Sequence, residues 1–415
     1  MSSPPTPAVS GLPGIHRATP PAEFLDAAVR IADRLRRPEQ VAEGVRADRP
    51  DGAPPWFWQA HGTAAGFAGL AVLFGCLDRA LPDGGWDRVA HQHLTAAVEA
   101  AQQVEVLSLG LAEGVSGLAF TALLLDHDGL RYRRLRRTLD QHLADRLPGV
   151  LGGLGRPAQL SSPDLDLISG AAGISCYLVR RPETDALSAL GTELREGLAR
   201  CVTEGRLPRR PTNGAVDCGL AHGLPGVLAA LAVARLRGAA TPGAATALRA
   251  GADWLWAHRL TDARGPDWPA DDTFPSPGPT HAAWCYGAPG VARSLLLTGR
   301  ALRDPALRAD ALRAATAVCQ RPDRVRRLVS PGFCHGTAGL AHLLRCTGLE
   351  TGRADLVAEA RRLVAELVTA FDPDARFGYR AGSPCLLDGA AGVAAVLLSA
   401  VGRPTPEWDR LFLIR

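Results

Sequence analysis

Residues 389–401 read GAAGVAAVLLSAV, a Gly-x-x-Gly step that runs directly into an apolar stretch. The same pattern occurs seven times along the chain. The first glycines of the copies are Gly66, Gly114, Gly170, Gly223, Gly287, Gly336 and Gly389. The second glycines lie 48 to 64 residues apart, an interval that fits two helices and their turns. We therefore predict seven helical-hairpin repeats.

The segments after the glycines predict how these hairpins pack. Stretches such as LAFTALLL (118–125) and VLAALAVA (227–234) are apolar all round, as expected of inner helices that are buried on most sides. Glycine suits such an entry to a helix, because it lacks Cβ and permits positive φ and close backbone approach. Strand signals are scarce, so the predicted class is all-α. Neither end of the series has an evidently polar capping copy, which favours a closed ring over an open solenoid.

The composition is that of a folded globular protein. Of the 415 residues, 47% are hydrophobic and 21% are charged, which excludes a disordered chain. The net charge of +4 is small for this length, and it argues against nucleic acid as the main partner. Residues 1–20 are rich in Pro, Ser and Gly and predict a flexible tail. Residues 21–415 are expected to form one domain.

The sequence also indicates a cellular compartment. The amino terminus has neither a basic start nor an apolar core, and no apolar stretch is long enough to span a bilayer, so we expect a cytoplasmic protein. The nine cysteines are an odd number without a framework spacing. In a reducing compartment they suggest buried thiols, metal ligands or a nucleophile instead of disulfides.

Equivalent repeats should bring the residues before each first glycine together at one end of the ring. Two of these turns carry cysteines, Cys285 in WCYGAPG and Cys334 in FCHGTAG, and His335 follows Cys334. Two thiolates and one imidazole form the ligand set of a catalytic zinc ion, with the fourth position left to water or substrate. The alternative is that both cysteines are small buried core residues. Their matching repeat positions and the adjacent histidine favour metal binding.

A second pair of side chains suits proton transfer. His222 precedes the glycine of AHGLPG, and Asp166 lies four residues before Gly170. Imidazole titrates near neutral pH, so a histidine and a carboxylate beside a metal-bound nucleophile could act as acid and base. The alternative is that His222 caps a helix and that Asp166 pairs with an arginine.

The glycine series, with the motifs AHGLPG, WCYGAPG and FCHGTAG, resembles the lanthionine synthetase C-like cyclases from about residue 60 to about residue 400. The resemblance implies an α/α toroid of paired inner and outer helices. It implies one zinc ion per chain, held by Cys285, Cys334 and His335, with His222 and Asp166 as the acid/base pair. The implied reaction adds peptide cysteine thiols to dehydroalanine or dehydrobutyrine, which forms lanthionine or methyllanthionine rings.

The resemblance also suggests substrate contacts and partners. Members of the family often carry an arginine four residues before the first zinc cysteine, where this chain has His281. His281, Trp284 and Tyr286 are weaker candidates for contact with the peptide. The implied partners are a dehydrated precursor peptide, a separate dehydratase and an exporter. Assembly with the exporter would place the protein beside a membrane-bound biosynthetic complex.

Two other functions use the same ligand set. A non-catalytic zinc module of this fold would bind glutathione or a cysteine peptide, but it would not need His222 and Asp166. A prenyltransferase-like enzyme that alkylates thiols would need a strongly aromatic pocket. The aromatic fraction here is only 5%, which counts against an isoprenoid substrate.

Overall fold

In the computed structural model of the chain, nearly all of the regular secondary structure is helical. It describes residues 22–49, 51–54, 57–127, 129–156, 160–183, 185–273, 280–380, 382–402 and 407–415. These residues form helices α1 to α17 and one antiparallel hairpin of strands β1 (Leu260–Asp262) and β2 (Gly265–Asp267). The all-α prediction is confirmed. The predicted flexible tail, residues 1–20, lies outside the described residues.

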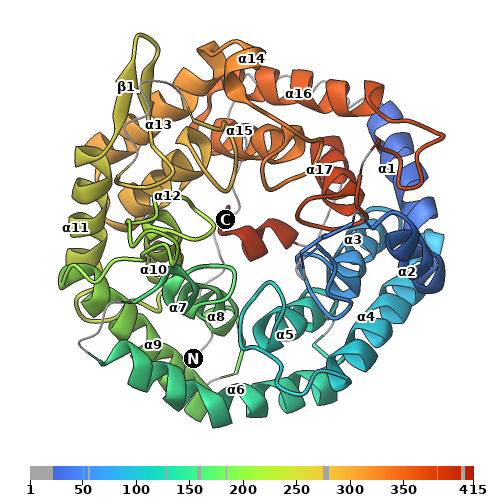
Figure 1. Cartoon of the computed structure of the whole chain (residues 1–415), viewed down its shortest axis with the longest axis horizontal. Helices are drawn as coiled ribbons and strands as arrows, with labels where there is room; N and C mark the ends of the chain where they lie inside the picture. Colours follow the sequence, from blue (N-terminus) through green and yellow to red (C-terminus); the bar gives the residue numbers. More distant parts are fainter. Residues whose placement is uncertain are drawn as a thin grey trace, which may run out of the picture.

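The helices that follow the seven Gly-x-x-Gly turns form an inner ring (Figure 1). They are α3 (Phe67–Ala80), α5 (Val115–Leu124), α8 (Ala171–Leu178), α10 (Leu224–Leu236), α12 (Ala288–Ala301), α15 (Thr337–Thr351) and α17 (Ala390–Val401). Helix α17 packs against α3, so the ring closes. In α10 every residue from Leu224 to Ala234 is buried, as the apolar sequence predicted.

A second ring of helices surrounds the first. It contains α1 (Ala22–Leu35), α4 (Trp86–Gln102), α6 (Arg133–Leu154), α9 (Ala186–Thr203), α11 (Ala244–Ala257), α13 (Pro305–Gln320) and α16 (Ala354–Thr369). Each outer helix packs on the inner helix that precedes it, except that α1 packs on α17. The seventh hairpin is thus assembled from helices near opposite ends of the chain. The predicted α/α toroid of seven hairpins is confirmed.

Short elements fill the periphery and the centre of the toroid. Helices α2 (Pro38–Ala47), α7 (Ser162–Leu165) and α14 (Asp323–Arg326) and the 3-10 turn η2 (Pro82–Gly84) join the longer helices. The 3-10 helix η3 (Trp408–Phe412) lies in the middle of the ring (Figure 1). We call residues 407–415, which include η3, the central arm.

Backbone hydrogen bonds tie the seven turns into a closed belt. An N–H group of each turn donates to a carbonyl oxygen of the next, with N···O distances between 2.8 and 3.2 Å. The bonds run from Ala64 to Ala112, Ala112 to Ile168, Leu167 to Ala221, Leu220 to Cys285, Cys285 to Cys334, Cys334 to Leu387 and Leu387 to Ala64. Because the series returns to its start, each turn is fixed by both neighbours. The belt therefore brings residues from distant parts of the chain to one face of the ring.

The repeated glycines are needed mainly for space. A Cβ atom on Gly339 would lie 1.8 Å from the carbonyl oxygen of Phe333, which no side chain could tolerate. Among the first glycines of the turns, only Gly287 has a positive φ, of 92°. The other six have negative φ, so the permitted positive φ is used only at Gly287. They cap the inner helices in ordinary extended geometry, and close backbone approach is what excludes larger residues.

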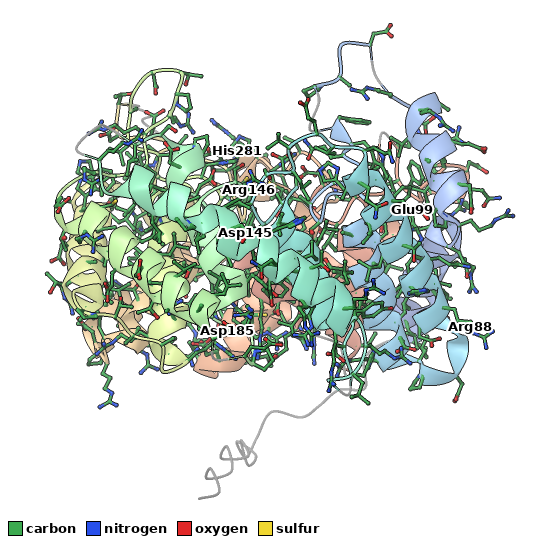
Figure 2. The ribbon with its side chains drawn as sticks, turned by 90° about the horizontal axis from the view of Figure 1, so that it is seen from below. Arg88, Glu99, Asp145, Arg146, Asp185 and His281 are labelled. Atoms are coloured by element: carbon green, nitrogen blue, oxygen red, sulfur yellow. The ribbon has the colours of Figure 1, made fainter. Side chains whose placement is uncertain are left out.

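Charged side chains cover the outer wall of the toroid. Figure 2 shows Arg88, Glu99 and Asp145 on the outer helices, away from the lumen.

Among the described residues, no helix is both long enough and apolar enough to cross a membrane.

Candidate active site

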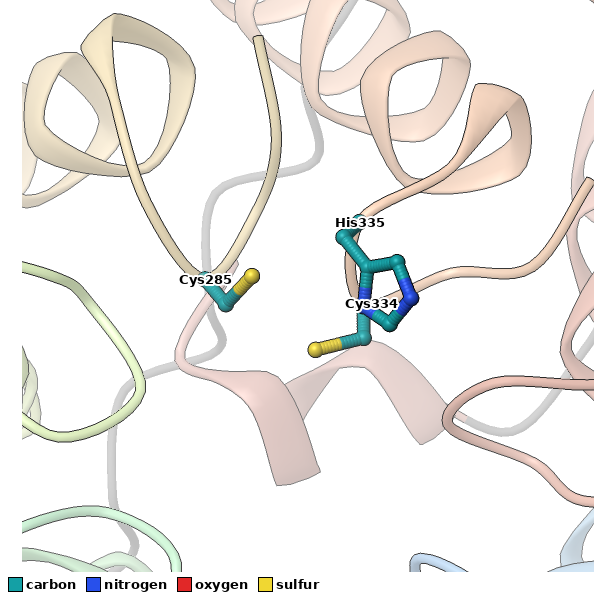
Figure 3. Close-up of side chains that lie close together, drawn as sticks. All are labelled: Cys285, Cys334 and His335. Atoms are coloured by element: carbon teal, nitrogen blue, oxygen red, sulfur yellow. The ribbon is translucent and has the colours of Figure 1, made fainter. Parts of the chain in front are cut away.

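Cys285 and Cys334 meet because their turns are neighbours in the belt. The backbone N–H of Cys285 donates to the carbonyl oxygen of Cys334 at 3.1 Å. The two sulfur atoms and a ring nitrogen of His335 all lie within 4.8 Å of one another. Figure 3 shows both thiols pointing into the space between the turns, with the imidazole beside them. The three predicted ligand residues are therefore together, although Cys285 and His335 are 50 positions apart in the sequence.

The electrostatics of this group suit a divalent cation. A hydrogen bond from Cys334 lowers the pKa of the Cys285 thiol to about 6, with His335 contributing in the same direction. One thiolate is thus stable near neutral pH. Cys285 is buried, whereas Cys334 and His335 are partly exposed, so an incoming ligand can reach the group. Two sulfurs and one nitrogen with an accessible side fit a tetrahedral metal that keeps one open position.

Asp388 extends this group on the seventh turn. Its Oδ1 lies 3.4 Å from Nδ1 of His335. A carboxylate that contacts a metal-binding histidine orients the ring and makes it a better ligand. Asp388 stands directly before Gly389, the same repeat position as His335, and no role was predicted for it from the sequence. Its place in the repeat was the signal that could have identified it.

His222 and Asp166 form a close pair on the third and fourth turns. Nδ1 of His222 lies 2.6 Å from Oδ2 of Asp166. The other carboxylate oxygen accepts the backbone N–H groups of Ser169 and Gly170, at 2.7 and 2.9 Å. Burial lowers the pKa of His222, but the hydrogen bond and charge of Asp166 outweigh it and raise the pKa. The carboxylate is fixed and fully buried, so it orients the His222 ring through Nδ1.

This pair lies beside the thiols. The turn that carries His222 is bonded to the turn of Cys285, since Leu220 N–H donates to Cys285 O at 2.8 Å. The negative charge of Cys285 also contributes to the raised pKa of His222. The Cys/Cys/His group and the His/Asp pair therefore belong to one site.

A polar cluster borders the site next to Cys285. The hydroxyl of Tyr286 donates to Oδ2 of Asp217 at 2.9 Å, and Nε of Arg210 donates to the same oxygen at 2.9 Å. The Arg210 guanidinium lies 5.2 Å from the centre of the Tyr286 ring. Arg210 and Asp217 precede the fourth turn and follow no repeat rule, so sequence reasoning could not single them out. The proposed contact of Tyr286 with substrate remains a prediction.

The other two candidates for substrate contact lie in different surroundings. His281 is exposed on the turn-bearing face, with Nδ1 3.0 Å from the carbonyl oxygen of Arg327 (Figure 2). Its role remains a prediction. Trp284 is fully buried, and its indole N–H donates to the carbonyl oxygen of Phe412 at 3.0 Å. The predicted contact of Trp284 with substrate remains a prediction, and in this structure its ring packs against Phe412 of the central arm.

The fold and the site define a class of protein: a double ring of helices with a Cys/Cys/His group and a His/Asp pair on one face. The chain belongs to the family described as lanthionine synthetase C-like protein, whose profile matches residues 58–413.

Individual relatives agree with this assignment. The nisin biosynthesis protein NisC of Lactococcus lactis subsp. lactis is 24% identical over 265 residues, which cover 57% of this chain. The matched part spans 62% of that protein's length. The solved structure of nisin cyclase superimposes with a TM-score of 0.76 at 18% identity, covering 91% of this chain and 96% of that chain. At this identity the structural likeness shows a shared fold.

Proposed function

We propose that the protein is a zinc-dependent lanthipeptide cyclase. Its reaction would be the intramolecular addition of a peptide cysteine thiol to dehydroalanine or dehydrobutyrine, which forms a lanthionine or methyllanthionine ring. The observation that carries the proposal is the convergence of Cys285, Cys334 and His335 beside the His222–Asp166 pair. The names of the relatives, a nisin biosynthesis protein and a nisin cyclase, support the same substrate class.

The proposed ligands of one zinc ion are Cys285, Cys334 and His335. Bound there, zinc would hold the peptide sulfur as a thiolate at neutral pH, because a cation strongly favours the deprotonated form. Asp388 would orient His335 through its contact with Nδ1. Cys334 and His335 are partly exposed, so a flexible peptide could reach the group.

His222 would complete the reaction by moving a proton. When the sulfur bonds to the β-carbon of the dehydro residue, the former double-bond electrons leave a carbanion at the α-carbon. Nε2 of protonated His222 can deliver the proton that this carbon needs. The proton that the peptide thiol loses then restores the protonated form of His222. The raised pKa of His222 keeps the imidazole protonated closer to neutral pH. Asp166 would hold the ring and favour its charged form.

The proposed setting follows from this chemistry. The substrate would be a dehydrated precursor peptide, supplied by a separate dehydratase and passed on to an exporter. We place the reaction in the cytoplasm, beside a membrane-bound biosynthetic complex. We also propose that residues 21–415 act as one domain, since α1 and α17 form one hairpin.

The test is a ring-closure assay on the zinc-loaded protein. A synthetic peptide with one dehydroalanine and one cysteine is incubated with enzyme and then alkylated with iodoacetamide. Ring closure leaves the peptide mass unchanged and removes the alkylation product, at a rate well above that without enzyme. A Cys201→Ala variant is the matched control, because Cys201 is a buried cysteine on the outer helix α9.

The result separates the proposal from its alternative. Free thiols after incubation with the zinc-loaded parent protein would contradict the cyclase function. If the same protein binds the peptide or glutathione through the metal without closing a ring, it is the non-catalytic thiol-binding module instead.

A further inference from the structure

The central arm contacts the residues that directly precede both proposed cysteine ligands. Trp284 comes just before Cys285, and Phe333 comes just before Cys334. The ring of Phe412 lies 5.3 Å from that of Trp284 and 4.7 Å from that of Phe333, centre to centre. The carbonyl oxygen of Phe412 also accepts the indole N–H of Trp284. One arm residue therefore touches both metal-bearing turns.

Buried arginines hold the end of the arm in the middle of the ring. Nε of Arg293, on α12, donates to the carbonyl oxygen of Ile414 at 2.7 Å. Nη2 of Arg180, which follows α8, donates to the backbone oxygen of Arg415 at 2.8 Å. Both arginines are buried, at 1% and 8% exposed, and the bond from Arg293 to Ile414 forms away from competing water. The arm is thus attached to two parts of the inner ring, the end of α8 and helix α12.

A charged cluster fixes the start of the arm. Oδ2 of the fully buried Asp409 lies 2.9 Å from Nε2 of His342, on α15, and accepts Nε–H of Arg415 at 2.7 Å. Cys346 Sγ is 3.8 Å from the same oxygen. His, Cys and Asp are metal-binding residue types, but the Arg415 guanidinium already supplies the positive charge that this carboxylate needs. We therefore read the cluster as an anchor of the arm and not as a second metal site.

The arm also fills the space beneath the belt. Leu411 and Phe412 lie against turn residues from several repeats, among them Thr63, Leu111 and Leu387. The space left between the arm and the belt is about 20 Å³ and is lined by apolar atoms. Close packing of this kind transmits small displacements to the turns above.

We propose that the central arm is a positioning element that sets the spacing of the Cys285 and Cys334 thiols. The inference rests on the metal site of the proposed function. The belt bond between the two cysteines fixes their backbones on one side, and Phe412 fixes the residues before them on the other. Loss of the Phe412 ring would let the two turns move apart, and the metal would lose its preformed ligand geometry.

The test measures metal binding by Phe412→Ala in the full chain. Zinc affinity is obtained by competition with a chromophoric chelator, and ligand geometry from the absorption spectrum of the cobalt-substituted protein. We expect zinc affinity to fall about 10- to 100-fold, the usual effect of disturbing residues that support metal ligands. The absorption bands of tetrahedral cobalt-thiolate coordination should weaken. Phe412→Leu restores most of the side-chain volume, so it should recover both the zinc affinity and these bands.

The matched control is Phe74→Ala. Phe74 is also a buried ring, on α3, and it stacks on His93, away from the two cysteine turns. Both alanine variants should lose similar global stability in urea, but only Phe412→Ala should lose metal affinity. If Phe412→Ala does not fold, Asp409→Asn is the milder variant, since it keeps the side-chain shape and removes the anchoring charge.

A metal-free measurement separates this proposal from the proposed function. Phenylarsine oxide forms two As–S bonds with a pair of adjacent thiols and releases water, so it reports their spacing directly. Slower capture by Phe412→Ala than by Phe74→Ala would support the arm proposal even if the parent protein binds no zinc. Equal capture, together with parent-like zinc affinity and cobalt spectrum, would overturn it.

Discussion

The imidazole of His222 and the carboxylate of Asp166 lie 2.6 Å apart, although they are 56 positions apart in the chain. The belt explains this contact. Leu167, next to Asp166, donates its N–H to the carbonyl oxygen of Ala221, next to His222, at 3.2 Å. The pairing of two turns in the ring thus creates the pairing of two chemical groups.

Replacing His222 with Asn should slow ring closure about 10²- to 10⁴-fold, the usual contribution of a general acid or base. Zinc content should stay at the parent value, because His222 is not among the three proposed ligands. The measurement compares single-turnover ring closure and metal content in the same preparations. A variant with full activity would exclude His222 as the proton donor.

Replacing Asp166 with Asn should shift the pH profile of ring closure. Asp166 raises the pKa of His222, so the pKa of His222 should be lower in the variant. Protonated His222 is present below its pKa, so the rate falls as pH rises through that value. In Asp166→Asn this fall should begin at lower pH. The amide oxygen of Asn can still accept the Ser169 and Gly170 N–H groups, so the fold should be kept. An unchanged profile would show that the pair does not control the reaction.

Alanine at Cys285, Cys334 or His335 should each remove most of the bound metal. About one zinc per chain is expected in the parent protein, since three ligands fit one tetrahedral ion. Elemental analysis after dialysis against a weak chelator provides the measurement. Cys201→Ala should retain the parent content. A zinc content unchanged by all three substitutions would exclude this metal site but would not affect the assignment of the toroid fold.

Asp388→Asn should weaken zinc binding about 10-fold or more without abolishing it, because it disturbs a ligand's support and not a ligand. Competition with a chromophoric chelator measures the affinity. Asp374→Asn, at an exposed position in the same part of the chain, is the control and should bind zinc like the parent. Equal affinities for the two variants would mean that Asp388 does not support His335.

His342 should make stability depend on pH. Burial lowers its pKa, but the charges of Cys346 and Asp409 outweigh burial and raise the pKa to about 9. A group with a raised folded pKa stabilises the fold below its unfolded value of about 6.5 and loses this effect as pH rises through about 9. The free energy of unfolding should therefore fall by up to about 3 kcal/mol over this range through His342.

Urea unfolding between pH 6.5 and 9.5 isolates this effect by comparing the parent with His342→Gln. The variant should show a smaller decrease in stability. His93→Gln is the control, because burial lowers the pKa of His93 to about 4 and keeps it neutral throughout the range. Parallel pH curves for the parent protein and His342→Gln would contradict a charged His342.

Much of the molecule could be predicted from the sequence because its information is local and repeated. The seven Gly-x-x-Gly steps determined the inner helices, since each marks a point where backbone contact excludes a Cβ atom, as at Gly339. Equivalent positions in equivalent turns then predicted that Cys285, Cys334 and His335 would lie together. The same logic placed His222 on that face of the ring.

Tertiary structure alone decided the features that follow no repeat. The seventh hairpin joins α1 to α17 across almost the whole chain, and closure of the ring is what selects that pairing. Arg210 and Asp217 reach the site through loop geometry, and Trp284 points to the core because Phe412 accepts its indole N–H. The central arm enters the lumen because the buried charges of Arg180, Arg293 and His342 need partners there. Local sequence patterns do not indicate which distant residues become partners, so these contacts can be identified only in the closed ring.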